Sequence, residues 1–298
     1  MARINAWLGT TDSDASVSAN WSLVAIPSSG MDIVIDARGE DNIGTAPWAF
    51  STAVSDGANK GVDLNSFKLT QGFTGDIGHP STGSGDLNVI AETIILDAYE
   101  GTAVYLTPAS NDSTGSAECV DLRIYAGDSD DECIRIGSVS TAYATNTFIF
   151  GGKVRLRNFK ASEVWCLTDN AEINRTASTE ISNWYQRNGA VTSSAGDATA
   201  DRLYIDGGTY DHRGGDVYYV KTAQEGTFKW SPSTDGKSID YAYADGGLID
   251  ASEGDKQSVF TYCTYAPGGT IDTRNADVTI TNEIDAGGTI IRDAGERV

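Results

Sequence analysis

The feature that most constrains the fold is a repeated phrase, Gly-Gly followed by Thr or Leu and then an aliphatic or aromatic residue. It occurs at 207–210, 246–249, 268–271 and 287–290. The second glycines are 39, 22 and 19 residues apart, and the first interval is close to twice the last. A period of about 19–22 residues in strand-turn-strand text is typical of one coil of a parallel β-helix. Glycine recurs there because the backbone turns sharply and needs positive φ.

Composition agrees with this interpretation. The chain has 30 Asp but only 12 Glu, and 33 Gly but only 12 Leu. Glu and Leu favour helices, whereas Gly, Asp and β-branched residues do not. Asp bonds readily to nearby backbone and therefore suits the turns between coils. The sequence predicts an all-β protein, a right-handed parallel β-helix, while an antiparallel β-sandwich or jelly roll remains the alternative.

Short β-branched runs between Gly/Asp turns predict the strands, and no segment carries the apolar stripe of a helix. The expected strands lie at 33–35, 67–69, 88–96, 103–106, 120–125, 133–136, 146–150, 153–156, 202–205, 217–220, 259–262 and 278–280. We expect an N-terminal arm or cap over 1–55 and a β-helix body over 56–298, with an irregular loop region at 56–86.

Charge and cysteine usage exclude several classes of protein. The 42 Asp and Glu outweigh the 21 Lys and Arg, giving a net charge of −21, so nucleic-acid binding is disfavoured. No apolar stretch is long enough to span a membrane, and the first residues lack the apolar core of a signal peptide. The spacings of Cys119, Cys133, Cys166 and Cys263 match no zinc or redox pattern and predict buried free thiols. A Cys119–Cys133 disulfide is the less favoured alternative.

Residues with catalytic or metal-binding chemistry are few. His79 and His212 both lie at predicted turns, and we expect both at the surface, because no nucleophile elbow accompanies them. The densest acidic cluster, Asp128, Asp130, Asp131 and Glu132, lacks the spacing of an EF-hand loop. A solvated turn is the favoured interpretation of that cluster, with Ca²⁺ binding as the alternative. No cofactor is expected.

Two features interrupt the acidic turn pattern. Trp7 and Trp21 flank a polar run near the start and would suit a lid over the end of an apolar stack, with local core packing as the overlapping alternative. Lys153, Arg155 and Arg157 alternate with apolar residues, so a strand would present all three on one face. Either acidic residues on adjacent coils balance these charges, or the face contacts an acidic partner or a neighbouring subunit. We predict partner contacts at these five residues.

The N-terminal pattern Trp7-x-Gly9, Asn20-Trp21-Ser22, Pro27-x-x-Gly30-x-Asp32-x-Val34-Ile35 resembles the opening of many bacteriophage structural proteins and some bacterial surface β-helix proteins. The resemblance covers about the first 36 residues. It implies a virion component such as a capsid cement or decoration protein, usually a homotrimer bound to the major capsid protein. Such a protein is assembled in the bacterial cytoplasm and has no catalytic site.

Two other functions fit the same predicted fold. One is a tailspike-like glycan hydrolase or lyase, in which a groove lined by Asp or Glu would do acid–base work. The other is a carbohydrate-binding surface protein. Fold alone does not choose between them and a structural role.

Overall fold

The computed structural model describes residues 3–10, 17–39, 63–78, 87–98, 102–108, 119–126, 134–137, 142–169, 171–176, 179–193, 199–274 and 276–293. In this part of the chain the regular structure is β-strand, apart from one 3₁₀ turn, Ser18–Asn20. The fold is a right-handed parallel β-helix, as the glycine repeat predicted. The chain divides into two units, Met1–Ser162 and Glu163–Val298, and the boundary falls within β10 (Phe159–Cys166).

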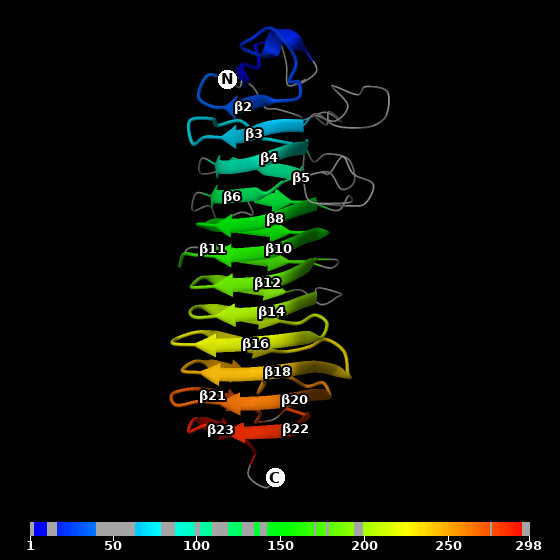
Figure 1. Cartoon of the computed structure of the whole chain (residues 1–298), viewed down its shortest axis with the longest axis vertical. Coiled ribbons are helices and arrows are strands. Elements are labelled where there is room, and N and C mark those ends of the chain that lie inside the picture. The colour runs from blue at the N-terminus through cyan, green and yellow to red at the C-terminus, as the bar shows by residue number, and fades with distance from the viewer. Residues whose placement is uncertain are drawn as a thin grey trace. The chain divides into compact units, whose positions relative to one another are not determined.

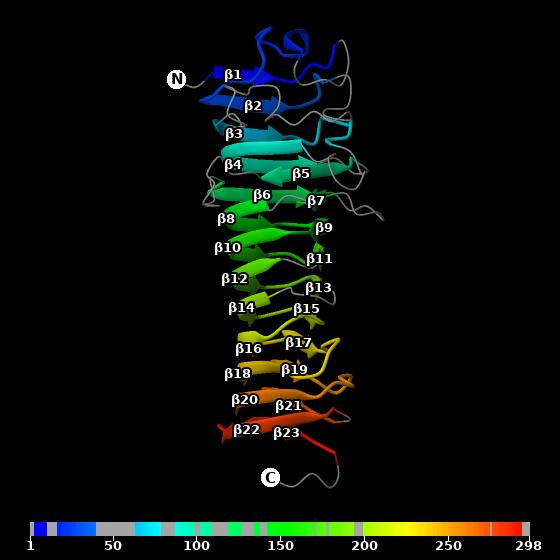
Figure 2. The same ribbon diagram turned by 90° about the vertical axis from the view of Figure 1, so that its right-hand side faces the viewer.

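In each unit the strands form two parallel sheets, which we call the long-strand sheet and the short-strand sheet. In the first unit the long-strand sheet runs in chain order (Figure 2) through β1 (Arg3–Ala6), β2 (Met31–Ile35), β3 (Asp63–Leu69), β4 (Leu87–Ala98), β6 (Asp121–Ala126) and β8 (Ala142–Ile149). Its short-strand sheet contains the first residues of β4 with β5 (Val104–Pro108), β7 (Ile134–Ile136) and β9 (Gly152–Leu156).

The second unit repeats this arrangement with more regular coils. Its long strands (Figure 1) are β12 (Glu180–Gln186), β14 (Thr199–Ile205), β16 (Val217–Ala223), β18 (Lys237–Asp245), β20 (Ser258–Tyr265) and β22 (Val278–Asp285). Its short strands are β11 (Ala171–Arg175), β13 (Ala190–Ser193), β15 (Thr209–His212), β17 (Thr227–Trp230), β19 (Leu248–Asp250), β21 (Thr270–Asp272) and β23 (Thr289–Ile291). The pairings within each sheet are parallel, which rules out an antiparallel sandwich for the described strands.

The pairing register confirms the repeat period. Val191 pairs with Tyr210, 19 residues later, and Ile249 pairs with Ile271, 22 residues later. The long interval in the glycine repeat contains an extra coil, because Tyr210 pairs with Phe228 and Phe228 pairs with Ile249. That coil has a single glycine, Gly226, in place of the Gly-Gly pair, so the repeated phrase does not mark it in the sequence.

The glycine turns have a definite structural role. The N–H of Thr270 donates to the carbonyl of Gly247 in the preceding coil at 2.9 Å, and Thr289 repeats the bond to Gly269. Gly268 has φ of 82°, in the left-handed region that glycine tolerates best. A Cβ on Gly269 would come 2.2 Å from the carbonyl oxygen of Ala244. The backbones of successive turns therefore lie too close together to leave room for a Cβ atom at Gly269.

Inward positions of successive coils form apolar ladders. In the short-strand sheet of the second unit, one ladder runs through Tyr210, Phe228, Ile249 and Ile271, all fully buried. Burying one such side chain stabilises the fold by about 1.5–3 kcal/mol. Cys119, Cys166 and Cys263 are buried free thiols, as expected, and burial raises the pKa of each to about 12. Cys133 lies outside the described residues.

Candidate functional site

The N-terminal arm closes over the first strands of unit one. Trp7 and Trp21 are fully buried and pack edge to face, with ring centroids 5.1 Å apart and planes 72° apart. Their backbones form an antiparallel bridge, and the N–H of Trp7 donates to the carbonyl of Val34 at 3.0 Å. The two indoles thus form the apolar floor of a cap. Because both rings are enclosed, they offer a partner no surface of their own. The predicted contact of Trp7 and Trp21 with a partner stays a prediction.

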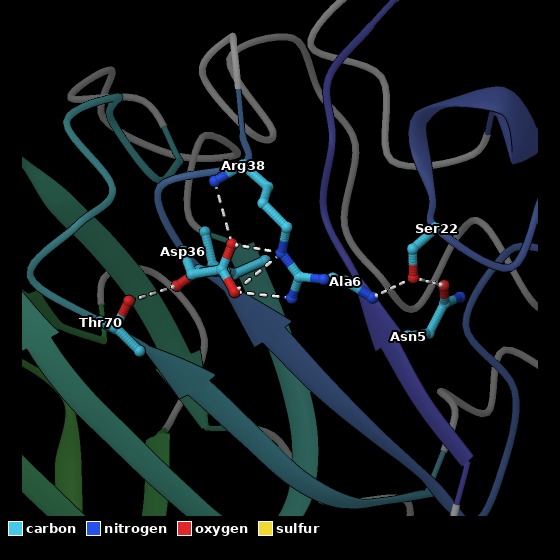
Figure 3. Close-up of polar contacts among 7 residues, drawn as sticks. Asn5, Ala6, Ser22, Asp36, Arg38 and Thr70 are labelled. Carbon is cyan, nitrogen blue, oxygen red and sulfur yellow. Dashed lines mark hydrogen bonds and ion pairs between the residues drawn. The ribbon is translucent and has the colours of Figure 1, made fainter.

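A buried asparagine holds the arm in place, and its side-chain oxygen accepts a hydrogen bond from the hydroxyl of Ser22 (Figure 3). The amide of Asn5 donates to the carbonyl of Ala25 at 2.7 Å, and its side-chain oxygen also accepts from the N–H of Leu23 at 3.1 Å. The hydroxyl of Ser22 accepts from the N–H of Ala6 at 2.9 Å. These bonds satisfy polar groups that would be costly to bury alone.

The same figure shows an ion pair at the end of β2. The Arg38 guanidinium reaches Asp36 at 2.6 Å and, through Nε, at 2.8 Å. This bond with Arg38 holds the pKa of the Asp36 carboxyl below its usual value. The pair fixes the turn that leaves β2, and we assign it a structural role.

The tip of the arm is apolar and exposed. Leu23 is 44% exposed and Val24 is 71% exposed. Val24 also has φ of 51°, a left-handed conformation that a β-branched side chain rarely adopts. Strained backbone of this kind persists where the surroundings hold it and is concentrated at binding and switch regions. If the arm contacts a partner, this tip is the part that reaches it.

The basic strand has the predicted alternation. Lys153, Arg155 and Arg157 are half-exposed, while Val154 and Leu156, between them, are buried. In the neighbouring strand β7, Arg135 pairs with Arg155 in register. Adjacent strands lie about 4.8 Å apart, so the basic surface extends from one strand to the next. The Arg135 guanidinium lies 4.4 Å from the ring centre of Tyr105, a cation–π contact.

The other residues predicted for chemistry divide into two groups. His79 and the acidic cluster from Asp128 to Glu132 lie outside the described residues. Over the described ranges, no group of three or more His, Cys, Asp or Glu side chains is placed to hold a metal ion. No helix in the same ranges is long and apolar enough to cross a membrane.

The prediction for His212 was wrong, because the side chain is completely buried. It follows Tyr210 by two residues in β15 and so also points inward, where Nε2–H donates to the carbonyl of Gly215 at 2.8 Å. Burial, together with the charge of Arg175, lowers the pKa of His212 to about 4. The sequence around it resembles a turn because Gly214 and Gly215 follow one residue after the end of the strand.

His212 belongs to an inward polar ladder in the second unit. Arg175 pairs with Ser193, Ser193 with His212, and His212 with Trp230. The Arg175 guanidinium is fully buried, contacts the hydroxyl of Tyr210, and has its pKa lowered to about 9 by burial. It therefore remains charged at neutral pH inside the β-helix.

The surface that sequence analysis missed is an aromatic one on the long-strand sheet of unit two. Two adjacent outward columns run across its coils, and we call them together the tyrosine face. One column, in register order, is Asn183, Arg202, Tyr219, Tyr241, Tyr262 and Asn282. The other is Tyr185, Tyr204, Lys221, Tyr243, Thr264 and Ile284.

The rings of the tyrosine face stack along the columns. Tyr185 and Tyr204 have centroids 5.0 Å apart and planes 8° apart, and Tyr241 and Tyr262 have values of 5.1 Å and 9°. Trp165 extends the first stack at 4.0 Å from Tyr185. Tyr241 and Tyr262 remain 40% and 41% exposed. A signal was present in the sequence, since Tyr219, Tyr241 and Tyr262 follow one another at about the coil period.

Two cations lie within the tyrosine face. Lys221 forms a 2.9 Å ion pair with Asp245 and lies 5.3 Å from the ring centre of Tyr243. The hydrogen bond with Asp245 raises the pKa of Lys221. The Arg202 guanidinium lies 5.5 Å from the ring centre of Tyr218, which borders the face and is 46% exposed. Tyrosine with arginine is the composition of strongly contributing residues in protein interfaces.

Comparisons of the chain with protein-family models, with curated proteins and with solved structures gave no match.

Proposed function

We propose that this chain is a non-enzymatic structural protein of a bacteriophage particle. In this role it acts as a cement or decoration protein, binding as a homotrimer to a shell of major capsid protein. It is assembled in the bacterial cytoplasm and resides in the virion. Oligomerisation and shell binding stabilise both partners by mass action, because only the folded, assembled forms bind.

The observation that carries the proposal is the structure of the N-terminal pattern that resembles phage structural proteins. Its residues build one feature, the cap: Trp7 and Trp21 form the floor, and Gly9 and Gly30 adopt positive φ of 61° and 78° in its turns. A capped end protects the first coil of a β-helix, which otherwise exposes unpaired backbone. The exposed tip at Leu23 and Val24 gives this arm an apolar surface for contact with the shell.

The basic strand supplies the second contact surface in the proposal. An acidic chain that binds another protein needs a local positive surface where that protein is negative. Lys153, Arg155 and Arg157 share such a surface with Arg135. Replacing all three predicted contact residues with Ser should weaken binding to particles that lack the protein, as measured by co-sedimentation.

A matched control removes three basic residues from the second unit instead, through Arg187→Ser, Lys237→Ser and Lys256→Ser. These replacements change the net charge equally and leave the strand around Arg155 intact. Unchanged particle binding in the basic-strand variant would contradict the assigned contact.

A second candidate function is binding or cleavage of a glycan, as in a tailspike-like enzyme or an adhesive surface protein. The observation in its favour is the tyrosine face, because aromatic and hydroxyl groups together suit sugars. Incubation with host capsule or lipopolysaccharide, followed by a reducing-end assay, separates the two functions. Turnover that is lost on replacing a single carboxylate would overturn the structural proposal.

A further inference from the structure

We propose that the tyrosine face is the surface on which a second copy of this chain docks. The inference rests on the proposed function in one respect, since it names the surface through which the homotrimer would form. It goes further in assigning self-association to the second unit rather than to the arm or the basic strand.

The first argument is the distribution of charge. The chain carries twice as many acidic as basic residues, yet the twelve positions of the two columns include no Asp or Glu. The outward column of the short-strand sheet in the same unit is different: Asp211, Lys229, Asp250 and Asp272 occupy four successive positions. Two copies that each carry −21 repel one another at most orientations. They approach most easily through a face without carboxylates.

The second argument is the composition of the surroundings. Asp201 is exposed next to Arg202, Asp240 lies next to Tyr241, and Asp245 borders the other column beyond Tyr243. An aromatic centre with a charged border is the usual anatomy of a protein interface. Carboxylates at the border keep the exposed rings from nonspecific association, and they favour one orientation of the partner.

The third argument is the orientation of the rings. Within each stack a tyrosine covers the ring face of its neighbour, at separations of 5.0 Å and 5.1 Å with nearly parallel planes. Sugar recognition uses open ring faces, whereas in these stacks each ring has a face covered by its neighbour. A broad, flat protein surface makes better use of ring edges, since they pack edge to face against other aromatic rings. The geometry therefore favours a second copy over a glycan.

The experiment is sedimentation velocity of the full chain across a range of concentrations, with the double variant Tyr241→Ser/Tyr262→Ser. The dissociation constant for self-association should rise about tenfold or more, because both side chains lie exposed near the centre of the face. Tyr241→Phe/Tyr262→Phe keeps the rings and should retain association. Tyr143→Ser removes a half-exposed tyrosine from β8 in the long-strand sheet of the first unit and serves as the matched control. Melting temperatures verify that each variant is folded.

Salt gives an independent measurement. Raising NaCl from about 0.05 M to about 0.5 M screens the repulsion between copies and should tighten their association. Binding to an acidic partner through Arg202 and Lys221 would weaken over the same range.

The outcomes distinguish this inference from the proposed function. A trimer unaffected by Tyr241→Ser/Tyr262→Ser, or one weakened only by Tyr143→Ser, overturns the assigned face and leaves the proposed function standing. A chain that stays monomeric at all concentrations overturns both. A monomer that is retained on a neutral polysaccharide, with retention lost in the Tyr241→Ser/Tyr262→Ser variant but not in the Tyr143→Ser control, assigns the face to a sugar and overturns the inference.

Discussion

His212 stacks on Trp230 inside the second unit, with ring centroids 5.4 Å apart and planes 4° apart. The imidazole is neutral in this stack, since burial lowers its pKa to about 4 and its Nδ1 has no hydrogen-bond partner among the described residues. A proton on His212 would place a second buried cation in the ladder that already contains Arg175.

The stack predicts loss of stability in acid. His212 has a folded pKa of about 4, below its ordinary value of 6.5, so the unfolded chain binds the proton first as pH falls. Stability is fully present above pH 6.5 and declines as pH falls towards 4, by about 3 kcal/mol in total from this residue. His212→Gln can keep a donor for Gly215 and does not titrate. Urea unfolding from pH 7 to pH 4 should therefore show a smaller decline for the variant, and equal declines would contradict the assignment.

The tryptophan pair predicts a large effect at the cap. Trp21→Ala removes a fully buried indole and its contact with Trp7, which should lower the free energy of unfolding by about 3–5 kcal/mol. Leu23→Ala, two residues later at an exposed position, should cost less than about 1 kcal/mol. Urea unfolding, followed by fluorescence, checks both, and similar losses would show that the pair does not close the end.

Stacking of the turns predicts that two glycines differ in their tolerance of alanine. At Gly269 a Cβ would lie 2.2 Å from a backbone carbonyl, whereas at Gly236 nothing lies within 4 Å, although φ is 77° there. Gly269→Ala should lower the unfolding free energy by about 3 kcal/mol, through overpacking against backbone. Gly236→Ala should cost about 1 kcal/mol, from conformational strain alone. Thermal and urea unfolding measure the difference, and equal costs would contradict close stacking.

The fold was predictable because the turn chemistry repeats. Gly268 and Gly287 need positive φ, and the residues beside them need room, so glycine marks each coil in the sequence. Strands with polar outward faces were harder to predict. Ala171–Arg175 has Glu, Asn and Arg among its five residues, and only the stacking of neighbouring coils makes it a strand.

The candidate surfaces were predictable only in part. The alternation around Arg155 follows from the two-residue period of a strand, and the structure has it. The tyrosine face was only partly visible in the sequence. Tyr219, Tyr241 and Tyr262 recur at about the coil period, but the shorter interval between the paired residues Arg202 and Tyr219 hides the continuation of that column. The surface position expected for His212 was wrong because Gly214 and Gly215, which begin two residues after it, are a turn signal, whereas His212 itself continues the inward ladder from Ser193.

The strained backbone at Val24 predicts that a single substitution there raises stability and weakens binding to particles. Its backbone is left-handed, with φ of 51°, and its side chain is 71% exposed, so burial gives little in return for the strain. Val24→Gly relieves the strain, which by itself should raise the unfolding free energy by about 1 kcal/mol. The greater conformational freedom of glycine in the unfolded chain offsets part of this gain. The same change removes an apolar group from the tip of the arm and should weaken binding to particles in co-sedimentation. Leu23→Ala serves as a control that removes apolar surface without relieving strain: it should weaken binding with no gain in stability. If Val24→Gly binds particles as well as the wild type does, the tip of the arm is not a contact.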